Sequence, residues 1–333
     1  MIIVGRMGLM ASLPSPRGPV SEVLVQTLGG NFVEQLAPWP ESASADSAAD
    51  AGRADETLSL WVLHELSYRG FTDVDERWEW HPDLLALRWR LEGGLEQRLR
   101  KRVPALQRTN DFVADLAALI GSDDGPSLAR HLQREGSRDE ALDLLRQRSI
   151  YHLKEADPTA WVVPRLPGGR AKAALVEVQF DEYGAGDPGR LHHDLFARGI
   201  VACGLSAEPG GYADDAITEV LEQNNAGSMF GMHRRLRGVA LGHFAAFEAT
   251  SSIPSRQLAQ GLSRLELPTE IQAYYEEHVE ADAVHEQVAL RDICGGLVAG
   301  EPDLAEDVLF GAWTCLDLEA RVATAMLERW EVA

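Results

Sequence analysis

The feature that most limits the fold of this chain is its succession of segments with the hydrophobic periodicity of helices. Alternating patterns of the kind that strands show are scarce. Glycine and proline separate the segments, and Pro158, Pro164 and Pro167 together break the chain near its middle. We therefore expect an all-α, compact multi-helix bundle. Helices are predicted at residues 57–68, 82–101, 110–120, 137–156, 171–183, 191–198, 214–223, 228–250, 255–263, 269–298 and 303–330.

The N-terminal part of the chain differs in composition from the rest. Residues 37–56 are rich in alanine, serine and aspartate, with no large apolar residue between Trp39 and Leu58, so they cannot bury a core face. We interpret them as a flexible acidic linker. With 333 residues the chain is long enough for one large core and an addition. The expected organisation is an N-terminal extension and linker at 1–56, an accessory helical region at 57–136 and the core at 137–333.

The balance of charge excludes several classes of partner. Lys and Arg total 31 against 52 Asp and Glu, a formal net charge of -21, which repels nucleic-acid phosphates and anionic membrane surfaces. No apolar stretch approaches the roughly 20 residues that span a bilayer. The three cysteines lie far apart, without the paired spacing of a zinc site or a disulfide framework. We expect a soluble cytoplasmic protein that binds neither nucleic acid nor membranes.

One predicted helix carries three metal-ligand side chains on a single face. His278, Asp282 and His285 are four and three residues apart, so at 100° per residue they fall within roughly 60° of arc. Two imidazoles and a carboxylate suit Fe(II), Mn(II) or Zn(II), and the interior of a helical bundle is a usual place for such a site. The alternative is a solvated polar face, since several glutamates share this helix.

A second candidate ligand lies in an apolar helical stretch. Glu248 is the single carboxylate near the end of RLRGVALGHFAAFEATSS, and an acid among apolar residues usually needs a partner. The alternative is an exposed acid at a helix end. His243 in the same stretch competes as a ligand, but a single histidine beside apolar residues is more often a hydrogen-bonded core or surface residue.

A third segment, LVEVQFDEYGAGDPGRLHHDLF, places acids before a glycine-rich break and two histidines after it. An acid carried toward the centre and a returning histidine would complete a second metal position. The residues alone do not choose between Glu177 and Glu182, or between His192 and His193. Residues 184–189 also match the dinucleotide pattern G-x-G-x-x-G, but the following helix is short, a proline lies in the turn and no further βαβ unit follows.

At these residues the sequence resembles the haem-oxygenase-like di-iron oxidases and oxygenases, often described as iron-containing redox enzymes. The similarity covers roughly residues 142–298 and is weaker upstream, in HELSYRGF and RWEWHPDLLALR. It is carried by EADPTAW, the glycine-containing segment above, the helix ending in Glu248 and the His278-x3-Asp282-x2-His285 pattern. Because the family fold is a seven-helix bundle, the resemblance implies a haem-oxygenase-like core at 137–333.

The resemblance also implies a site for two Fe(II) ions. Six side chains would hold them: Glu182 as a bridging carboxylate, His192 and Glu248 as ligands of one iron, and His278, Asp282 and His285 distributed over the pair. As catalytic residues, Glu182 and Glu248 would shift between terminal and bridging positions. Some relatives use a further carboxylate from an earlier helix, for which Glu155 is the nearest candidate, although its sequence distance to Glu182 fits only approximately.

The function implied by the resemblance is the oxidation of a small organic molecule with O2 as co-substrate. N-oxygenation of an amine is preferred over C–H hydroxylation and oxidative C–C cleavage. The external electron donor is unknown, and the sequence leaves open a redox partner and a homodimer. The alternative is a non-metal module on the same fold, either a ligand-binding protein or a cofactorless oxidase.

Overall fold

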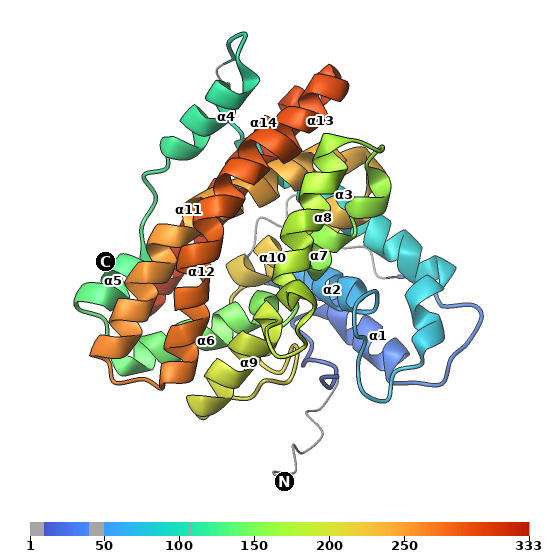
Figure 1. Cartoon of the computed structure of the whole chain (residues 1–333). Helices are drawn as coiled ribbons and strands as arrows, with labels where there is room; N and C mark the ends of the chain where they lie inside the picture. Colours follow the sequence, from blue (N-terminus) through green and yellow to red (C-terminus); the bar gives the residue numbers. More distant parts are fainter. Residues whose placement is uncertain (1–9, 40–49, 107, 333) are drawn as a thin grey trace.

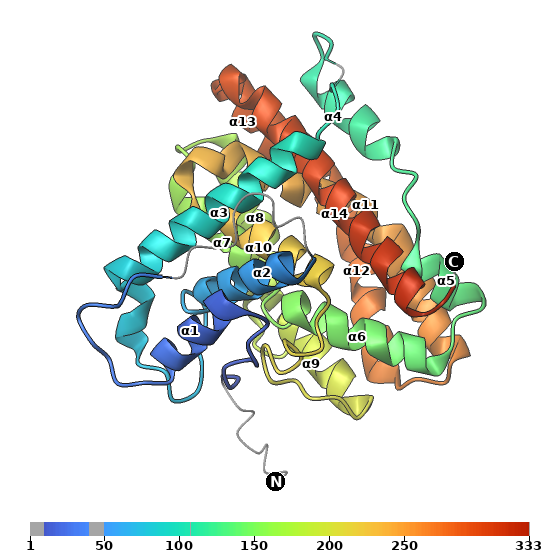
Figure 2. The same cartoon turned by 180° about the vertical axis from the view of Figure 1, so that it is seen from behind.

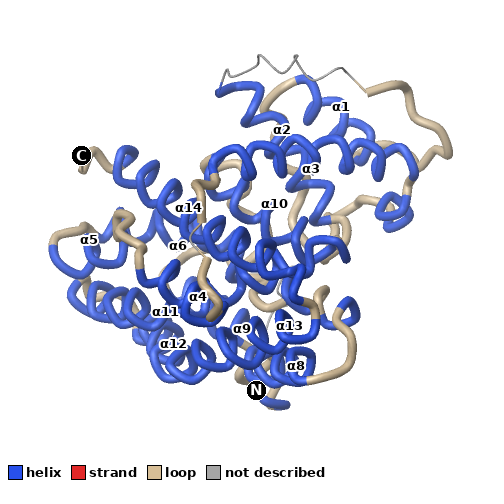
Figure 3. The backbone as a smooth tube through the Cα atoms, turned by 90° about the horizontal axis from the view of Figure 1, so that it is seen from above, coloured by secondary structure: helices blue, strands red, loops and turns tan. Residues whose placement is uncertain are grey.

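The computed structural model describes residues 10–39, 50–106 and 108–332, without the side chains of residues 50 and 280–284. Within these ranges every regular element is a helix and no strand is present (Figure 3), which confirms the all-α prediction. None of the helices in this part of the chain is both long and apolar enough to cross a membrane. Short 3₁₀ turns lie at Glu76–Trp80, Val163–Arg165, Gly184–Gly186, Arg234–Leu236 and Pro302–Leu304.

Three long helices form the centre of the bundle. Helix α11 (Arg237–Arg264) packs along α12 (Thr269–Gln287) and α14 (Ala305–Arg329), and the short α5 (Leu128–Arg134) also contacts it (Figures 1 and 2). The sequence of α14 explains its placement, because buried side chains recur on one face two helical turns apart. These are Val308, Cys315 and Val322.

Two glycines bring the backbones of α11 and α14 into contact. A Cβ atom at Gly242 would lie 1.8 Å from the carbonyl oxygen of Val308, and one at Gly311 would lie 2.0 Å from that of Val239. Both distances are far below van der Waals contact, and a backbone carbonyl cannot rotate away as a side chain can. Any side chain at either position would therefore force the two helices apart.

The helices that precede α11 complete the core around α12. They are α6 (Arg138–His152), the single-turn α7 (Asp157–Ala160), α8 (Arg170–Glu182), α9 (His192–Ala202) and α10 (Thr218–Met232). Helix α9 packs on α12. Helix α8 packs on the two elements that follow α12 in the chain, the π-helical segment Val288–Cys294 and α13 (Gly295–Gly300). The turn between α8 and α9 is thus held close to α12.

The first three helices gather on one side of this core (Figure 3). They are α1 (Pro19–Leu28), α2 (Asp50–Glu65) and α3 (Pro82–Arg102), and the next helix, α4 (Phe112–Gly121), lies apart from them (Figure 1). Helix α2 contacts α1, α3 and α10, so the first helices are joined to the core by packing. By contrast, α4 packs against α14. The division into three regions stays a prediction.

Helix α2 begins inside the stretch predicted as a linker. Of residues 37–56, residues 40–49 lie outside the described part of the chain, and residues 50–56 are helical, which corrects that part of the prediction. Polar contacts explain the helix: Asp55 accepts hydrogen bonds from the first turn of α1 at 2.9 and 2.8 Å, and Arg53 forms ion pairs with two glutamates of α10 at 3.0 and 2.9 Å. Hydrophobic periodicity cannot reveal such contacts.

Other helix boundaries differ from the predicted ones for local reasons. The helices expected at 228–250 and 255–263 are replaced by α10 and the continuous α11, with a break at residues 233–236. Helix α11 continues through Pro254 because α12 and α14 pack along it. Helices α1 and α5 were not predicted, and both are short, with 10 and 7 residues.

Candidate metal centre

The turn between α8 and α9 positions two of the predicted ligands. Glu182 is the last residue of α8 and His192 is the first residue of α9, and both are buried. The chain reverses between them through Gly184, whose φ of +79° favours glycine. A Cβ atom there would lie 2.8 Å from the carbonyl carbon of Arg190. The glycine-rich stretch therefore closes a loop and brings the two side chains together.

Helix α12 supplies two further ligands and α11 supplies one. His278 and His285 are seven residues apart, so they lie on the same face of α12, two turns from each other. Glu248 of α11 faces them from the neighbouring helix, and all three side chains are buried. The side chain of Asp282 lies outside the described residues, so its predicted role as a ligand stays a prediction.

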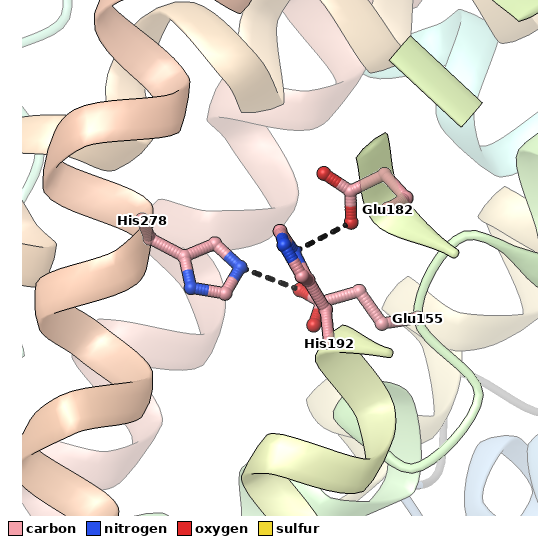
Figure 4. Close-up of side chains that lie close together, drawn as sticks. All are labelled: Glu155, Glu182, His192 and His278. Atoms are coloured by element: carbon pink, nitrogen blue, oxygen red, sulfur yellow. Dashed lines mark ion pairs between the residues drawn. The ribbon is translucent and has the colours of Figure 1, made fainter. Parts of the chain in front are cut away.

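A first group of four buried side chains contains Glu155 as well as three predicted ligands. One donor atom from each of Glu155, Glu182, His192 and His278 lies within 4.8 Å of every other (Figure 4). His192 Nδ1 is 3.0 Å from Glu182 Oε2. His278 Nε2 is 3.7 Å from Glu155 Oε1. These four side chains come from α12, the loop after α6 and the two ends of the α8–α9 turn.

A second group shares one member with the first. Glu182, Glu248 and His285 also offer donor atoms within 4.8 Å of one another. His285 Nδ1 lies 3.3 Å from Glu248 Oε2 and 3.8 Å from Glu182 Oε1. Glu182 therefore stands between two clusters of donors, one on each side of its carboxylate.

Two residues that sequence reasoning did not single out hold Glu155 in place. The hydroxyl of Tyr274 donates to Glu155 Oε2 at 2.8 Å, and His152 Nδ1 lies 3.2 Å from Glu155 Oε1. Both had a signal in the sequence: His152 precedes Glu155 by three residues, and Tyr274 precedes His278 by four, the spacings of neighbours on one helix face. Ala156, directly after Glu155, has a φ of +72°, an unusual value for alanine.

The hydrogen bonding of His278 fixes which ring nitrogen can accept a metal. Its Nδ1 lies 2.8 Å from the backbone carbonyl oxygen of Tyr274. Because a carbonyl only accepts hydrogen bonds, Nδ1 carries a proton, which leaves Nε2, on the side of Glu155, as the ring nitrogen able to bind a metal. A carbonyl partner of this kind is the usual way in which proteins orient a metal-binding imidazole.

The charges of the site are unevenly balanced. Burial raises the pKa of Glu248, and the nearby negative charge of Glu182 raises it further. The contact with His285 lowers this pKa, but not enough to cancel the rise. Burial would lower the pKa of His285, yet its carboxylate neighbours raise it to about 9. For Glu155, burial opposes ionisation, but the imidazoles of His152 and His278 hold its pKa well below the ordinary value.

The donor set fits divalent metal ions. Three buried carboxylates converge on one small volume, where uncompensated negative charge is costly. Imidazole and carboxylate donors together suit iron, manganese or zinc, and helical bundles carry two-metal sites of this composition. Cations here would replace the proton that His285 holds, so metal binding should release protons.

The alternatives left open by the sequence separate clearly in space. Glu177 is exposed on α8, and His193 belongs to neither donor group, whereas Glu182 and His192 belong to the first. Asp181 is half exposed and lies 3.3 Å from His285 Nε2, on the outer side of that ring. Residues 184–186 form a 3₁₀ turn between two helices, which is incompatible with the strand and helix of a dinucleotide-binding unit.

A small cavity borders the carboxylates. Its walls include Glu155, Glu182, Glu248 and His278, and its empty volume is about 300 Å³. Gln179, one turn before Glu182, also lines it and is only 5% exposed. Neither the oxygen nor the nitrogen of its side-chain amide has a hydrogen-bond partner among the described residues. A buried amide without partners is expected where a ligand binds.

Comparisons with known proteins show the family of this chain. No curated protein matches the chain. The crystal structure of a CADD-like protein of unknown function from Nostoc punctiforme is 17% identical, covers 72% of this chain and 96% of its own, and gives a TM-score of 0.47. The family described as iron-containing redox enzymes matches residues 142–320. This match confirms the resemblance seen in the motifs, and the chain belongs to the family of iron-containing redox enzymes.

Proposed function

We propose that this chain is an O2-using, non-haem di-iron oxidase or oxygenase that acts on a small organic molecule. The observation that carries the proposal is the pair of buried donor groups that share Glu182. One carboxylate between two clusters of donors is the arrangement required of a bridging ligand. Glu155 joins the proposed ligands, with Glu182, His192, Glu248, His278, Asp282 and His285.

Each residue of the site has a task that the contacts support. An iron pair bound here would supply the electron-transfer chemistry with O2 that amino-acid side chains lack. Tyr274 holds a proton on its hydroxyl and donates it to Glu155 in a hydrogen bond, which keeps that carboxylate oriented. The carbonyl of Tyr274 orients His278 in the same way. Glu182 and Glu248 both lie close to His285, and in the proposed reaction their carboxylates would shift between terminal and bridging positions.

Among the reactions implied by the resemblance, we favour N-oxygenation of an amine. Conversion of R–NH2 and O2 to R–NHOH and H2O consumes two electrons and two protons, so the reaction needs an external two-electron reductant. A hydrogen-bond acceptor without a partner, the side-chain oxygen of Asn224, lines a larger cavity that adjoins the small one. Such an acceptor suits an N–H group better than it suits an aliphatic chain.

Iron stoichiometry tests the proposal. Anaerobic loading of the full chain with Fe(II), followed by removal of excess iron, should leave about two irons per chain, as in other bundles with two-metal carboxylate sites. His285→Gln should lower this number. The matched control is His131→Gln, at a largely buried histidine of α5 that stacks on Trp330, and it should retain full loading. A native chain that retains no iron would refute the proposal.

A second candidate function is a non-metal module, favoured by the presence of the larger apolar cavity. This alternative predicts that His278→Ala and His285→Ala leave ligand binding and stability unchanged. The di-iron proposal predicts that both variants lose iron, because removal of a donor leaves a coordination position open and a carboxylate unbalanced. The same iron assay therefore separates the two.

A further inference from the structure

A larger cavity lies beside the carboxylate cluster. Its empty volume, including the part open to solvent, is about 860 Å³, and residues of α6, α7, α10, α11 and α14 line it. It shares four lining residues with the small cavity: Tyr151, Thr159, Phe244 and Phe247. A molecule in the larger cavity would therefore be separated from the proposed metal site only by these side chains.

The charged groups of this cavity neutralise each other. Arg148 and Glu319 form two parallel contacts, each 3.0 Å long. Gln223 donates to the same carboxylate at 2.7 Å. Because a paired Arg–carboxylate unit has little capacity left for a ligand, neither a cation nor an anion would find a counter-ion here.

Asn224 offers the cavity an unused acceptor. The residue is 5% exposed, and its amide nitrogen donates to the backbone carbonyl of Val220 at 3.0 Å. That bond fixes the orientation of the amide, so the oxygen Oδ1 is the atom left without a partner among the described residues. A buried acceptor of this kind is costly unless a donor reaches it.

His243 offers a second uncommitted polar atom. Its Nε2 is buried without a hydrogen-bond partner in the described part of the chain. Its ring packs against that of Phe230. Burial lowers the pKa of His243 to about 4, only weakly opposed by Glu319, so the ring is neutral at pH 7.

We propose that this cavity binds the substrate, and that the substrate is an uncharged, mainly apolar molecule with one N–H or O–H donor directed at Asn224. Its role as the substrate site rests on the proposed function. The walls contain the rings of Tyr151, Phe230, Phe244 and Phe247, which suit a flat apolar group. Within the amines, this selects a weakly basic aromatic amine, whose nitrogen is uncharged at neutral pH, over an aliphatic ammonium ion.

A series of small probes tests the inference without catalysis. Isothermal titration calorimetry of the full chain at pH 7 would compare aniline and phenol, which are neutral donors, with toluene, the benzylammonium cation and the benzoate anion. Aniline and phenol should bind about tenfold tighter than toluene, the effect of one hydrogen bond to a buried acceptor. Both ions should bind more weakly than toluene. Equal binding of toluene and aniline, tighter binding of either ion, or no binding at all would overturn the inference.

Variants locate the binding in this cavity. Asn224→Leu should weaken aniline about tenfold and leave toluene unchanged. Asn224→Asp should reverse the preference, because a carboxylate would then favour benzylammonium over aniline. His131→Phe, remote from the cavity, is the control and should bind every probe as the native chain does. If Asn224→Leu fails to fold, the native series and Asn224→Asp still decide the matter.

The binding series and the iron assay fail independently. Two irons per chain together with a failed probe series would overturn the substrate inference and leave the di-iron proposal intact. Aniline binding at the expected level in a chain that retains no iron would overturn the di-iron proposal and leave the binding site intact. In that case the cavity would belong to a non-metal module.

Discussion

At the scale of single residues, Gln179 is a polar group whose burial should cost stability. Its amide has no partner among the described residues, so replacing it by methionine removes an unsatisfied group from the interior. We predict that Gln179→Met raises the free energy of unfolding of the iron-free chain by about 1 to 2 kcal/mol. Urea unfolding at pH 7 measures the change.

Gln147 provides the matched control for this substitution. It is 2% exposed, and both ends of its side-chain amide are hydrogen-bonded. The nitrogen donates to the carbonyl of Asp215 and the oxygen accepts from the N–H of Ile217, each at 3.0 Å. Gln147→Met should therefore lower the free energy of unfolding by about 1 to 3 kcal/mol. If both variants lose stability equally, ordered water satisfies the amide of Gln179 and the prediction is wrong.

His243 should make the stability of the chain depend on pH. Its pKa of about 4 in the folded state lies below the 6.5 of an exposed imidazole, because burial disfavours the charged ring. The unfolded state therefore takes up the proton first, and the stability present above pH 6.5 is lost as the pH falls toward 4. Between pH 7 and pH 5 this histidine should account for a loss of about 2 kcal/mol.

His243→Phe isolates this contribution. The charged groups that line the same cavity, Glu319 from α14 and Arg148 from α6, remain in the variant. Urea unfolding at pH 7 and at pH 5 should show a smaller loss for the variant than for the native chain, by about 2 kcal/mol. An identical loss in both proteins would mean that His243 is not buried as a neutral ring.

At the scale of elements, the crossing of α11 and α14 depends on two glycines. Gly242→Ala would place a methyl group against the carbonyl of Val308, which cannot move without shifting the whole helix. We predict a loss of about 3 kcal/mol or more in the free energy of unfolding, at the upper end of the range for overpacking. Gly311→Ala should behave similarly, and thermal or urea unfolding measures both.

Gly93 in α3 is the control for helical glycine. It is exposed, and nothing lies within 4 Å of the Cβ atom that alanine would add. Gly93→Ala should raise the free energy of unfolding by up to about 1 kcal/mol, because alanine favours the helix. A harmless Gly242→Ala would show that the two backbones are less closely packed than described.

At the scale of the whole molecule, metal binding should stabilise the folded chain. The donors come from four helices and a loop, and unfolding separates them, so metal binds the folded state far more tightly. Fe(II) at 100 times its dissociation constant should add about 2.7 kcal/mol to the free energy of unfolding. Anaerobic thermal unfolding with and without Fe(II) measures this effect. Glu182→Gln, which removes the shared carboxylate, should abolish most of it.

The parts of the site that depend on residues close together in sequence could be predicted, and the parts that depend on distant residues could not. Spacing on one helix placed His278 and His285 on a common face, and the glycine-rich break predicted that an acid before it lies near a histidine after it. The choices of Glu182 over Glu177 and of His192 over His193 needed the resemblance, because neighbouring acids or histidines on one helix look alike in sequence. The position of Glu155 depends on the turn at Ala156, whose unusual backbone conformation no sequence pattern predicts.

The fold was predictable as a class but not in all its boundaries. Apolar spacing revealed the long helices, whereas the N-terminal half of α2 is held by charges at Arg53 and Asp55 that act across the sequence. Pro254 suggested a helix end that packing overrides. The large cavity, with Asn224 and His243, lies between five helices. Hydrophobic patterns within single segments do not show how separate helices pack together.

The spread of the donors along the chain sets an order of events during synthesis. Glu155 is the first of them and His285 the last, with neither donor group complete before α12 has been made. A ribosome-bound fragment that ends before His278 carries carboxylates from both groups but lacks the histidines of α12 that complete them. In the proposed function, iron is therefore captured late in the life of the nascent chain, after α12 has left the ribosome.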